Sequence, residues 1–185
     1  MKVIMPDVRI AFASIFSPSK MTDDQNATPR YSVTSLIEPG SATAKAIMAA
    51  VKEVAAEKWG DKSKGILDGL VKKDRICYHT VEKTNKKGEI YDGFAGMHFV
   101  TASCEVRPQV VDRNKSPLTQ ADGRPYGGCY CNIIVDIWAQ DNKFGQRVNA
   151  KLGAIQFVKD GAAFSGGAVM GVDDFEVVES AEDFV

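Results

Sequence analysis

The sequence lacks any apolar run near the roughly 18 residues that a membrane span requires. Its opening stretch, MKVIMPD, has no apolar core of signal-peptide length, so we expect no leader and no membrane contact. Common catalytic motifs are missing as well: G-x-S-x-G, a Walker loop, H-E-x-x-H and a Rossmann fingerprint after the first strand. These absences argue against a membrane protein and against several large enzyme classes.

Cysteine and histidine are scarce, with four cysteines and two histidines in 185 residues. The cysteines do not form the C-x₂₋₄-C pairs of a zinc site, even when His79 and His98 are counted beside them. Each lies in an apolar, strand-like run, which predicts buried free thiols and no metal or other cofactor. Unpaired thiols are typical of a reducing compartment, so we expect a cytoplasmic protein. The four residues are Cys77, Cys104, Cys129 and Cys131.

A net charge of only −1 conceals an asymmetry along the chain. Residues 173–185 contain six acids and no base; taking these six from the 24 acidic residues leaves 23 basic against 18 acidic residues in 1–172, a net of +5. This predicts a basic domain over 1–172 and an acidic C-terminal tail over 173–185, an arrangement typical of proteins that meet polyanions. The alternative is a solvated, frayed C-terminus. Aromatic residues within the tail favour docking, and the candidate partner-binding residues are Asp173, Asp174, Phe175, Glu182, Asp183 and Phe184.

Hydrophobic periodicity predicts a mainly β protein with one α-helix. Alternating apolar residues indicate strands at 8–13, 31–37, 75–81, 97–107, 129–139 and 146–158. An apolar stripe predicts a helix over 42–59, with Ser41 as its N-cap and Gly60 as its stop. Loops are expected at 14–30, 82–96, 108–128 and 160–172, and 60–74 shows only a short apolar turn. The pattern suits a small barrel or curled sheet with a helix lying across it.

Aromatic and basic residues recur together on the predicted loops and on mixed strand faces. Unpaired bases stack on rings for about 1–3 kcal/mol each, and Lys and Arg neutralise the phosphates between them. The expected phosphate contacts are Arg107, Arg113, Lys115, Arg124, Lys151 and Lys159, with Lys83, Lys86 and Lys87 as a mobile clamp. The expected stacking residues are Tyr78, Tyr91, Phe94, Phe99, Tyr126, Tyr130 and Trp138, of which Tyr130 and Trp138 are the first we expect to find in the core. Together these residues predict a non-enzymatic, sequence-tolerant binder of single-stranded nucleic acid.

Four stretches carry a resemblance to a known family: VRIAFASIFSP; PRYSVTSLIEPG; RPQVVDRN with YGGCYCNIIVDIWAQDN; and LGAIQFVKDGAAFSGG. They resemble a family of phage single-stranded-DNA-binding proteins, earlier catalogued as a domain of unknown function. The resemblance implies an OB-fold-like barrel of five or six strands and a role in phage DNA replication or recombination, in the host cytoplasm. It also implies an acidic tail that recruits replication or recombination enzymes and competes with DNA. Here the sequence departs from the pattern, because Phe184 is followed by Val185.

Two other functions stay open at this point. A structural or assembly protein could use the same basic face to bind an acidic protein partner. A metal-dependent nuclease could use Asp112, Asp136 or His98. A homodimer stays open as well.

Overall fold

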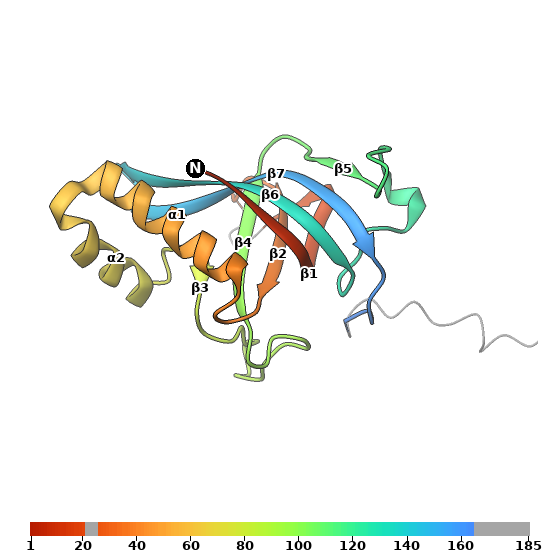
Figure 1. Cartoon of the computed structure of the whole chain (residues 1–185), viewed down its shortest axis with the longest axis horizontal. Coiled ribbons are helices and arrows are strands. Elements are labelled where there is room, and N and C mark those ends of the chain that lie inside the picture. Colours follow the sequence, from red (N-terminus) through yellow and green to blue (C-terminus); the bar gives the residue numbers. More distant parts are fainter. Residues whose placement is uncertain (21–25, 165–185) are drawn as a thin grey trace, which may run out of the picture.

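A five-stranded closed barrel forms the body of the protein in the computed structural model, which describes residues 1–20 and 26–164 (Figure 1). Its strands are β1 (Lys2–Ser19), β2 (Arg30–Ile37), β4 (His98–Cys104), β6 (Tyr130–Asn142) and β7 (Gly145–Lys159). They are hydrogen-bonded in the order β4-β2-β1-β6-β7, and a parallel pairing of β4 with β7 closes the ring. Two short strands extend it: β3 (Tyr78–His79) lies beside β4, and β5 (Gln109–Val111) lies beside β7. The predicted mainly β, OB-fold-like architecture is confirmed.

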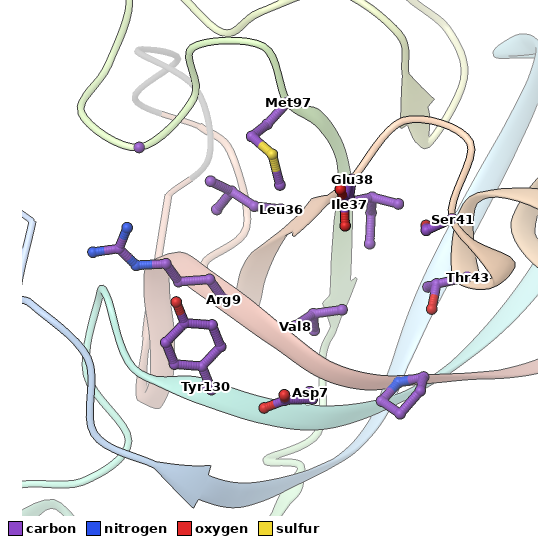
Figure 2. A pocket seen from close by; sticks show the side chains of 12 residues that line it. Asp7, Val8, Arg9, Leu36, Ile37, Glu38, Ser41, Thr43, Met97 and Tyr130 are labelled. Carbon is purple, nitrogen blue, oxygen red and sulfur yellow. The ribbon is translucent and has the colours of Figure 1, made fainter.

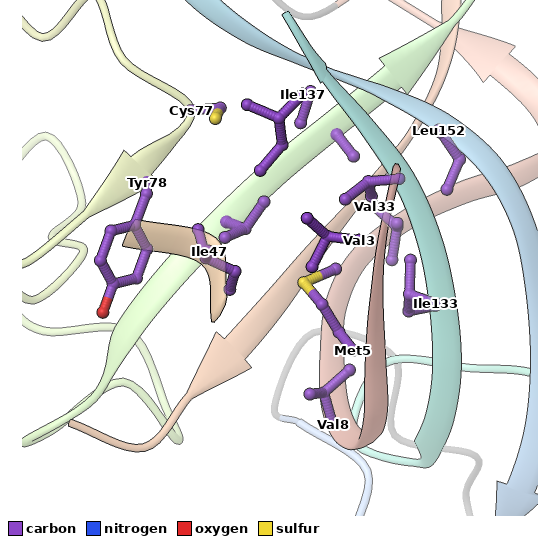
Figure 3. Close-up of a cluster of buried hydrophobic side chains, with 14 of the residues drawn as sticks. Val3, Met5, Val8, Val33, Ile47, Cys77, Tyr78, Ile133, Ile137 and Leu152 are labelled. Carbon is purple, nitrogen blue, oxygen red and sulfur yellow. The ribbon is translucent and has the colours of Figure 1, made fainter. Parts of the chain in front are cut away.

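The barrel core follows the alternation expected from the sequence. On β6, the side chains of Cys131, Ile133, Val135 and Ile137 are all fully buried. They meet buried residues of β1, β2 and β4, among them Met5 and Val33 (Figure 3). All four cysteines are buried and free, as predicted. Burial is the main cause that raises the pKa of the Cys77 thiol to about 12, so this cysteine packs as a small apolar side chain.

The predicted helix is α1 (Ala42–Trp59). It begins where the Ser41 hydroxyl accepts a hydrogen bond from the Ala44 amide at 3.1 Å, and it ends at Gly60, whose φ of 55° suits glycine. Its apolar stripe, which includes Ile47 and Val54, packs against β6 and β1. The helix therefore covers one side of the barrel, as Figure 1 shows.

A second helix follows in a region for which the sequence indicated only an apolar turn. After a short 3₁₀ turn, η1 (Gly60–Lys62), the chain forms α2 (Ser63–Lys72), whose Leu70 is buried while Ile66 and Leu67 are half-buried. This helix has only ten residues, and two of them are glycines, so its helix propensity is low. Its apolar pattern therefore does not distinguish it from a loop in the sequence. Packing against α1 supplies the stability that propensity lacks. Within the described residues, no helix has both the length and the hydrophobicity needed to cross a membrane.

Strand limits also differ from the expectation. The first strand, expected over 8–13, extends in β1 from Lys2 to Ser19, while the strand expected over 75–81 shortens to the two residues of β3. Another short 3₁₀ helix, η2 (Gln120–Asp122), lies in the long loop before β6. The strand expected over 97–107 ends in β4 at Cys104. Val106 therefore lies beyond the strand, and its side chain is 80% exposed.

A bulge in β1 changes the direction of one aromatic side chain. Alternation over 8–13 puts Phe12 on the same side of the strand as Val8 and Ile10, which are buried, but the pairing of β1 with β2 shifts register between Ala11 and Ser14. Phe12 has a φ of 48° and its side chain is 48% exposed. A positive φ in a bulky residue is a costly conformation, and bulges commonly re-aim a side chain. The bulge thus puts an aromatic ring on the barrel surface.

The register of β6 predicts opposite effects for two neighbouring truncations. Ile137→Ala should lower the free energy of unfolding by about 2–5 kcal/mol, because its side chain is fully buried. Trp138→Ala should change it by less than about 1 kcal/mol, because the indole points outward. Urea unfolding followed by far-UV circular dichroism measures both values. Equal losses for the two variants would contradict this register, since a one-residue slip exchanges the two faces.

Candidate nucleic-acid interface

Short hydroxyl side chains cover the middle of the outer face of β1, β2 and β4. The pairing places Ser14 opposite Ser32, Ser32 opposite Ser103, and Thr34 opposite Thr101. Thr34 and Thr101 bring their Oγ1 atoms to 3.4 Å. Ser32 and Thr34 are buried between their neighbours, and the other three are half-buried. We call this surface the hydroxyl strip; its residues are Ser14, Ser32, Thr34, Thr101 and Ser103.

Aromatic rings and a lysine border one end of the hydroxyl strip. The ring of Phe12 meets that of Tyr91 edge to face, with centroids 5.0 Å apart. The Lys83 Nζ lies 5.7 Å from the ring centre of Phe12 and 5.2 Å from that of Phe99. Such cation–ring contacts fix a lysine over an aromatic surface. This end therefore offers the exposed ring of Phe12 and the half-buried ring of Tyr91 beside a positive charge.

The other end of the strip carries a second ring with cations. The guanidinium carbon of Arg107 lies 5.8 Å from the ring centre of Phe16. Arg30 donates from Nε to the Ser103 hydroxyl at 3.1 Å and pairs with Glu105. Lys151 is exposed and lies directly opposite Ser103, where β7 closes the barrel. A neutral floor thus lies between two ring-and-cation groups.

Three predicted stacking residues must be corrected, because their rings are buried. Tyr78 is 5% exposed in the main core, and its hydroxyl shares a 2.7 Å hydrogen bond with His98 Nδ1. Phe94 and Phe99 are 1% and 5% exposed and, with Ala11 and Leu36, form a second small core under the 82–97 loop. These rings anchor the loop and leave no face for a base to stack on.

The loop that carries the predicted clamp is held in a defined turn. The Asn85 side chain accepts hydrogen bonds from the Lys87 and Glu89 amides at 2.8 and 3.0 Å. Lys86 and Lys87 are exposed at this turn, whereas Lys83 lies half-buried at the strip. Phe94 fixes the base of the loop, so Lys83 and Tyr91 have definite positions.

The remaining predicted cations form a second group around the 112–124 loop and the adjoining ends of β6 and β7. Arg124 lies over the ring of Phe157 at 5.3 Å and pairs with Asp160 at 2.9 Å. The Lys159 ammonium is 4.6 Å from the Tyr130 ring centre and 3.0 Å from an Asp7 oxygen. A pocket of about 530 Å³ lies here, lined by Asp112, Arg113, Asn114, Leu118, Asp122, Arg124 and Phe157.

Other predicted residues of this second group serve the local structure. The Tyr126 hydroxyl shares its one proton between an Asp160 carboxylate oxygen at 3.0 Å and the Gly161 carbonyl oxygen at 2.9 Å, which fixes the chain after β7. Lys115 takes a φ of 67° in a tight turn and is exposed. Tyr130 is half-buried, and Trp138 is 42% exposed, so the expectation that Trp138 belongs to the core is wrong.

A second pocket, of about 380 Å³, lies between the first half of β1, the end of β2 and the start of α1 (Figure 2). Arg9 lies at its edge and donates hydrogen bonds to the carbonyl oxygens of Gly128 and Ala162 at 3.0 and 2.7 Å. Its guanidinium also lies 4.2 Å from the ring centre of Phe164, whose ring leaves no room for a Cβ at Gly93. Arg9 thus fastens the last described residues to the edge of the second core.

The residues proposed for a nuclease have separate structural partners. Asp112 accepts hydrogen bonds from the Asn114 and Ser116 amides, both at 2.8 Å. Asp136 holds the N-terminal ammonium at 2.7 Å, and His98 bonds to Tyr78. Over residues 1–20 and 26–164, no three histidine, cysteine or acidic side chains are grouped to hold a metal ion.

Comparison with known proteins identifies the family. A family model described as the single-stranded-DNA-binding protein of Enterobacter phage Enc34 matches residues 1–185. The chain belongs to this Enc34 family. Putative protein p50 of Acyrthosiphon pisum secondary endosymbiont phage 1 is 40% identical over 187 residues, covering 99% of this chain and 97% of that protein.

Solved structures of phage proteins share the fold. The truncated single-stranded DNA-binding protein of phage Enc34 matches with a TM-score of 0.61 and 24% identity, over 88% of both chains. The same phage's protein in complex with single-stranded DNA matches with a TM-score of 0.58 and 21% identity, over 86% of both chains. The gp2.5 protein of phage T7 matches with a TM-score of 0.57 and 13% identity, over 97% of this chain and 98% of that one. At these identities the agreement concerns the fold.

Four residues at or near this surface escaped the sequence analysis. Phe12 was not selected, because alternation puts it on the side of Val8 and Ile10 and cannot reveal a bulge, and Phe16 fell in a segment expected to be a loop. Arg9 lies within β1 and Arg30 at the start of β2, away from the basic loops in which the sequence predicts most phosphate contacts. The run FASIFSPS, with two phenylalanines and three serines, is the one signal that could have pointed to this face.

The histidine beside the strip predicts a pH dependence of stability. The His79 ring stacks on Phe99 at 4.3 Å, and burial lowers its pKa below 6.5, an effect to which Lys83 adds and which the Asp74 ion pair opposes. The unfolded chain therefore binds a proton more readily, so His79 should cost stability as the pH falls below about 6.5. We expect the free energy of unfolding to drop less between pH 7.5 and 5.5 in His79→Gln than in the wild type. Parallel urea-unfolding profiles for the two proteins would contradict this.

Proposed function

We propose that this protein binds single-stranded DNA, largely without sequence preference, on the outer face of β1, β2 and β4. The observation that carries the proposal is the hydroxyl strip bordered at both ends by a ring and a cation, Phe12 with Lys83 and Phe16 with Arg107. Membership in the Enc34 family supports it, as does the solved complex of the Enc34 protein with single-stranded DNA.

The chemistry of this face favours an unpaired strand. Rings stack on any base, but in a duplex the base faces are covered by their neighbours. Lysine and arginine neutralise phosphates without reading the bases, and short hydroxyl side chains offer few contacts that would distinguish one base from another. The surface therefore combines affinity for a charged backbone with tolerance of sequence.

The protein acts by binding alone in this proposal. It coats exposed strands during phage DNA replication or recombination, in the cytoplasm of the host. Family membership supports a binding role. The residues first considered for a nuclease, Asp112, Asp136 and His98, each take part in a hydrogen bond or ion pair that stabilises the fold.

Titration of fluorescently labelled oligo-dT, followed by anisotropy at several salt concentrations, tests the proposal. Affinity should fall steeply with salt, with a slope of about −0.7 per phosphate neutralised. Phe12→Gly should bind about tenfold more weakly at every salt concentration, because one stacked base is lost. Lys83→Gln should reduce the magnitude of the salt slope by about 0.7, because one phosphate contact is lost.

Matched variants separate these effects from damage to the fold. Phe12→Tyr keeps the ring and should bind as the wild type does, and Lys64→Gln removes an exposed lysine from α2, away from the strip. Salt-independent binding, or equal affinity for duplex and single strands, would contradict the function. Displacement of the DNA by polyglutamate as readily as by unlabelled oligo-dT would favour an acidic protein partner instead.

We further propose that the acidic tail over 173–185 competes with DNA for this face and recruits replication or recombination enzymes. The tail lies outside the described residues. What supports the proposal is its six acids and the position of Phe164, the last described residue, which packs against the small core that also contacts Tyr91. The described chain therefore ends beside the Phe12 end of the strip.

Deleting residues 173–185 should tighten binding to oligo-dT at low salt, because a competing polyanion is removed. The gain should shrink as salt rises, since screening weakens the tail and the DNA alike. A full-length variant with the six acids replaced by Asn or Gln is the control, and it should reproduce the gain. Unchanged or weaker affinity in both proteins, measured by the same anisotropy titration, would reject tail competition.

A further inference from the structure

The hairpin formed by β6 and β7 extends beyond the barrel and lies beside the C-terminal half of α1 (Figure 1). We call its residues 136–151 the arm. The outer face of the arm carries large exposed rings where a sheet surface is normally polar: Trp138 is 42% exposed and Phe144, at the tip, is 70% exposed. Exposed cations accompany them, namely Lys143, Arg147 and Lys151.

The strand register places the indole between two of these cations. Trp138 lies opposite Asn149, and the adjacent outward rows pair Asp136 with Lys151 and Gln140 with Arg147. Diagonal neighbours across an antiparallel pair are about 7–8 Å apart, within reach of long side chains. Trp138 therefore has Lys151 on one diagonal and Arg147 on the other. At the tip, the Lys143 ammonium lies 5.1 Å from the ring centre of Phe144.

The acidic groups of the arm already have partners. Asp136 holds the N-terminal ammonium at 2.7 Å. Asp141 accepts hydrogen bonds from Trp59 Nε1 at 2.8 Å and from the Gln146 amide at 3.0 Å, and these bonds lower its pKa. The bond from Trp59 also ties the arm to the end of α1. The arm is therefore held in place, and its outward charge is mainly positive.

The arm continues directly from the hydroxyl strip. Lys151 pairs with Ser103 on one side and with Asp136 on the other, so a single row crosses from β1 through β2, β4 and β7 to β6. Three strand spacings, from Ser14 to Lys151, amount to about 14 Å. The six residues from Lys151 to Gly145 add about 20 Å along the arm. The continuous surface is thus more than twice as long as the strip alone.

We infer that the arm is a second section of the single-strand track, engaged only by DNA longer than the strip can hold. This rests on the proposed function. Where the DNA extends beyond Lys151, Trp138 stacks on one of its bases, and Arg147 and Lys151 neutralise the phosphates on either side of that base. Phe144 provides a further ring at the far end. The ligand is the same unpaired DNA, and charge complementarity together with continuity from the strip selects it over an apolar protein partner.

Oligomers of two lengths test the inference, because a single OB barrel holds about 4–16 nucleotides. Trp138→Ala should bind dT16 about tenfold more weakly, the loss of one stacked base, and should change the affinity for dT6 less than twofold. Arg147→Gln should reduce the magnitude of the salt slope for dT16 by about 0.7 and leave that for dT6 unchanged. Anisotropy of labelled oligomers measures all four values.

Intrinsic fluorescence gives a second readout. The chain has two tryptophans, so the difference in emission between the wild type and Trp138→Phe isolates the signal of Trp138 and leaves the bond from Trp59 to Asp141 intact. The Trp138 emission should be quenched by dT16 and much less by dT6. Trp138→Phe should keep most of the affinity, because it keeps a ring. Val71→Ala is the matched control, since Val71 is 54% exposed on α2, and it should bind both oligomers as the wild type does.

The outcomes separate the inference from the function on which it rests. If the wild type binds dT16 and Trp138→Ala binds it equally well, the arm is not part of the track, while the proposed function stands. If Trp138→Ala weakens dT6 and dT16 alike, Trp138 belongs to the first section and the inference of a second section is overturned. If the wild type binds neither oligomer, the proposed function itself fails.

Discussion

One long strand, β1, holds the barrel together because it must pair with two different strands. Its first half pairs with β6 and its second half with β2, so the strand has to bend sharply between them. The bend is made by register shifts between Met5 and Val8 and between Ala11 and Ser14, with a φ of 48° at both Asp7 and Phe12. Bulges of this kind increase local twist and redirect side chains. The same distortion that closes the barrel therefore turns the ring of Phe12 toward solvent, at the edge of the candidate interface.

The hydroxyl strip is neutral in its middle and carries cations at both ends. Short hydroxyl side chains in the middle of β1, β2 and β4 keep the surface low, while long side chains such as Phe16 and Arg107 stand at its margin. The cations of the second group, Arg124 and Lys159, are ion-paired with Asp160 and Asp7, which reduces the field that they present to a polyanion. Lys83 instead lies over rings, which leaves its charge available. The strip is therefore the stronger candidate of the two surfaces for a single strand.

Regular patterns in the sequence predicted the regular parts of this fold. The alternation over 129–139, the apolar stripe over 42–59 and the four thiols in apolar runs all correspond to buried faces. The candidate site was harder to predict because it depends on exceptions to periodicity. Phe12 is turned out by a bulge, and Phe94 and Phe99 are hidden by a loop that folds back over the outer face. Tertiary contacts decided both cases, and a single sequence shows no local signal for a loop that covers a strand.

The two ends of the hydroxyl strip differ in what lies beside them. Phe164, held by Arg9 and fitted against Gly93, brings the chain that precedes the acidic tail to the Phe12 end. The arm begins at the opposite end, where Lys151 pairs with Ser103. The described chain ends at Phe164 beside the Phe12 end, whereas the arm lies beyond the other end of the strip. The tail competition and the arm contact proposed above would therefore act at different places on one track, with Trp138 and Arg147 at the end far from Phe164.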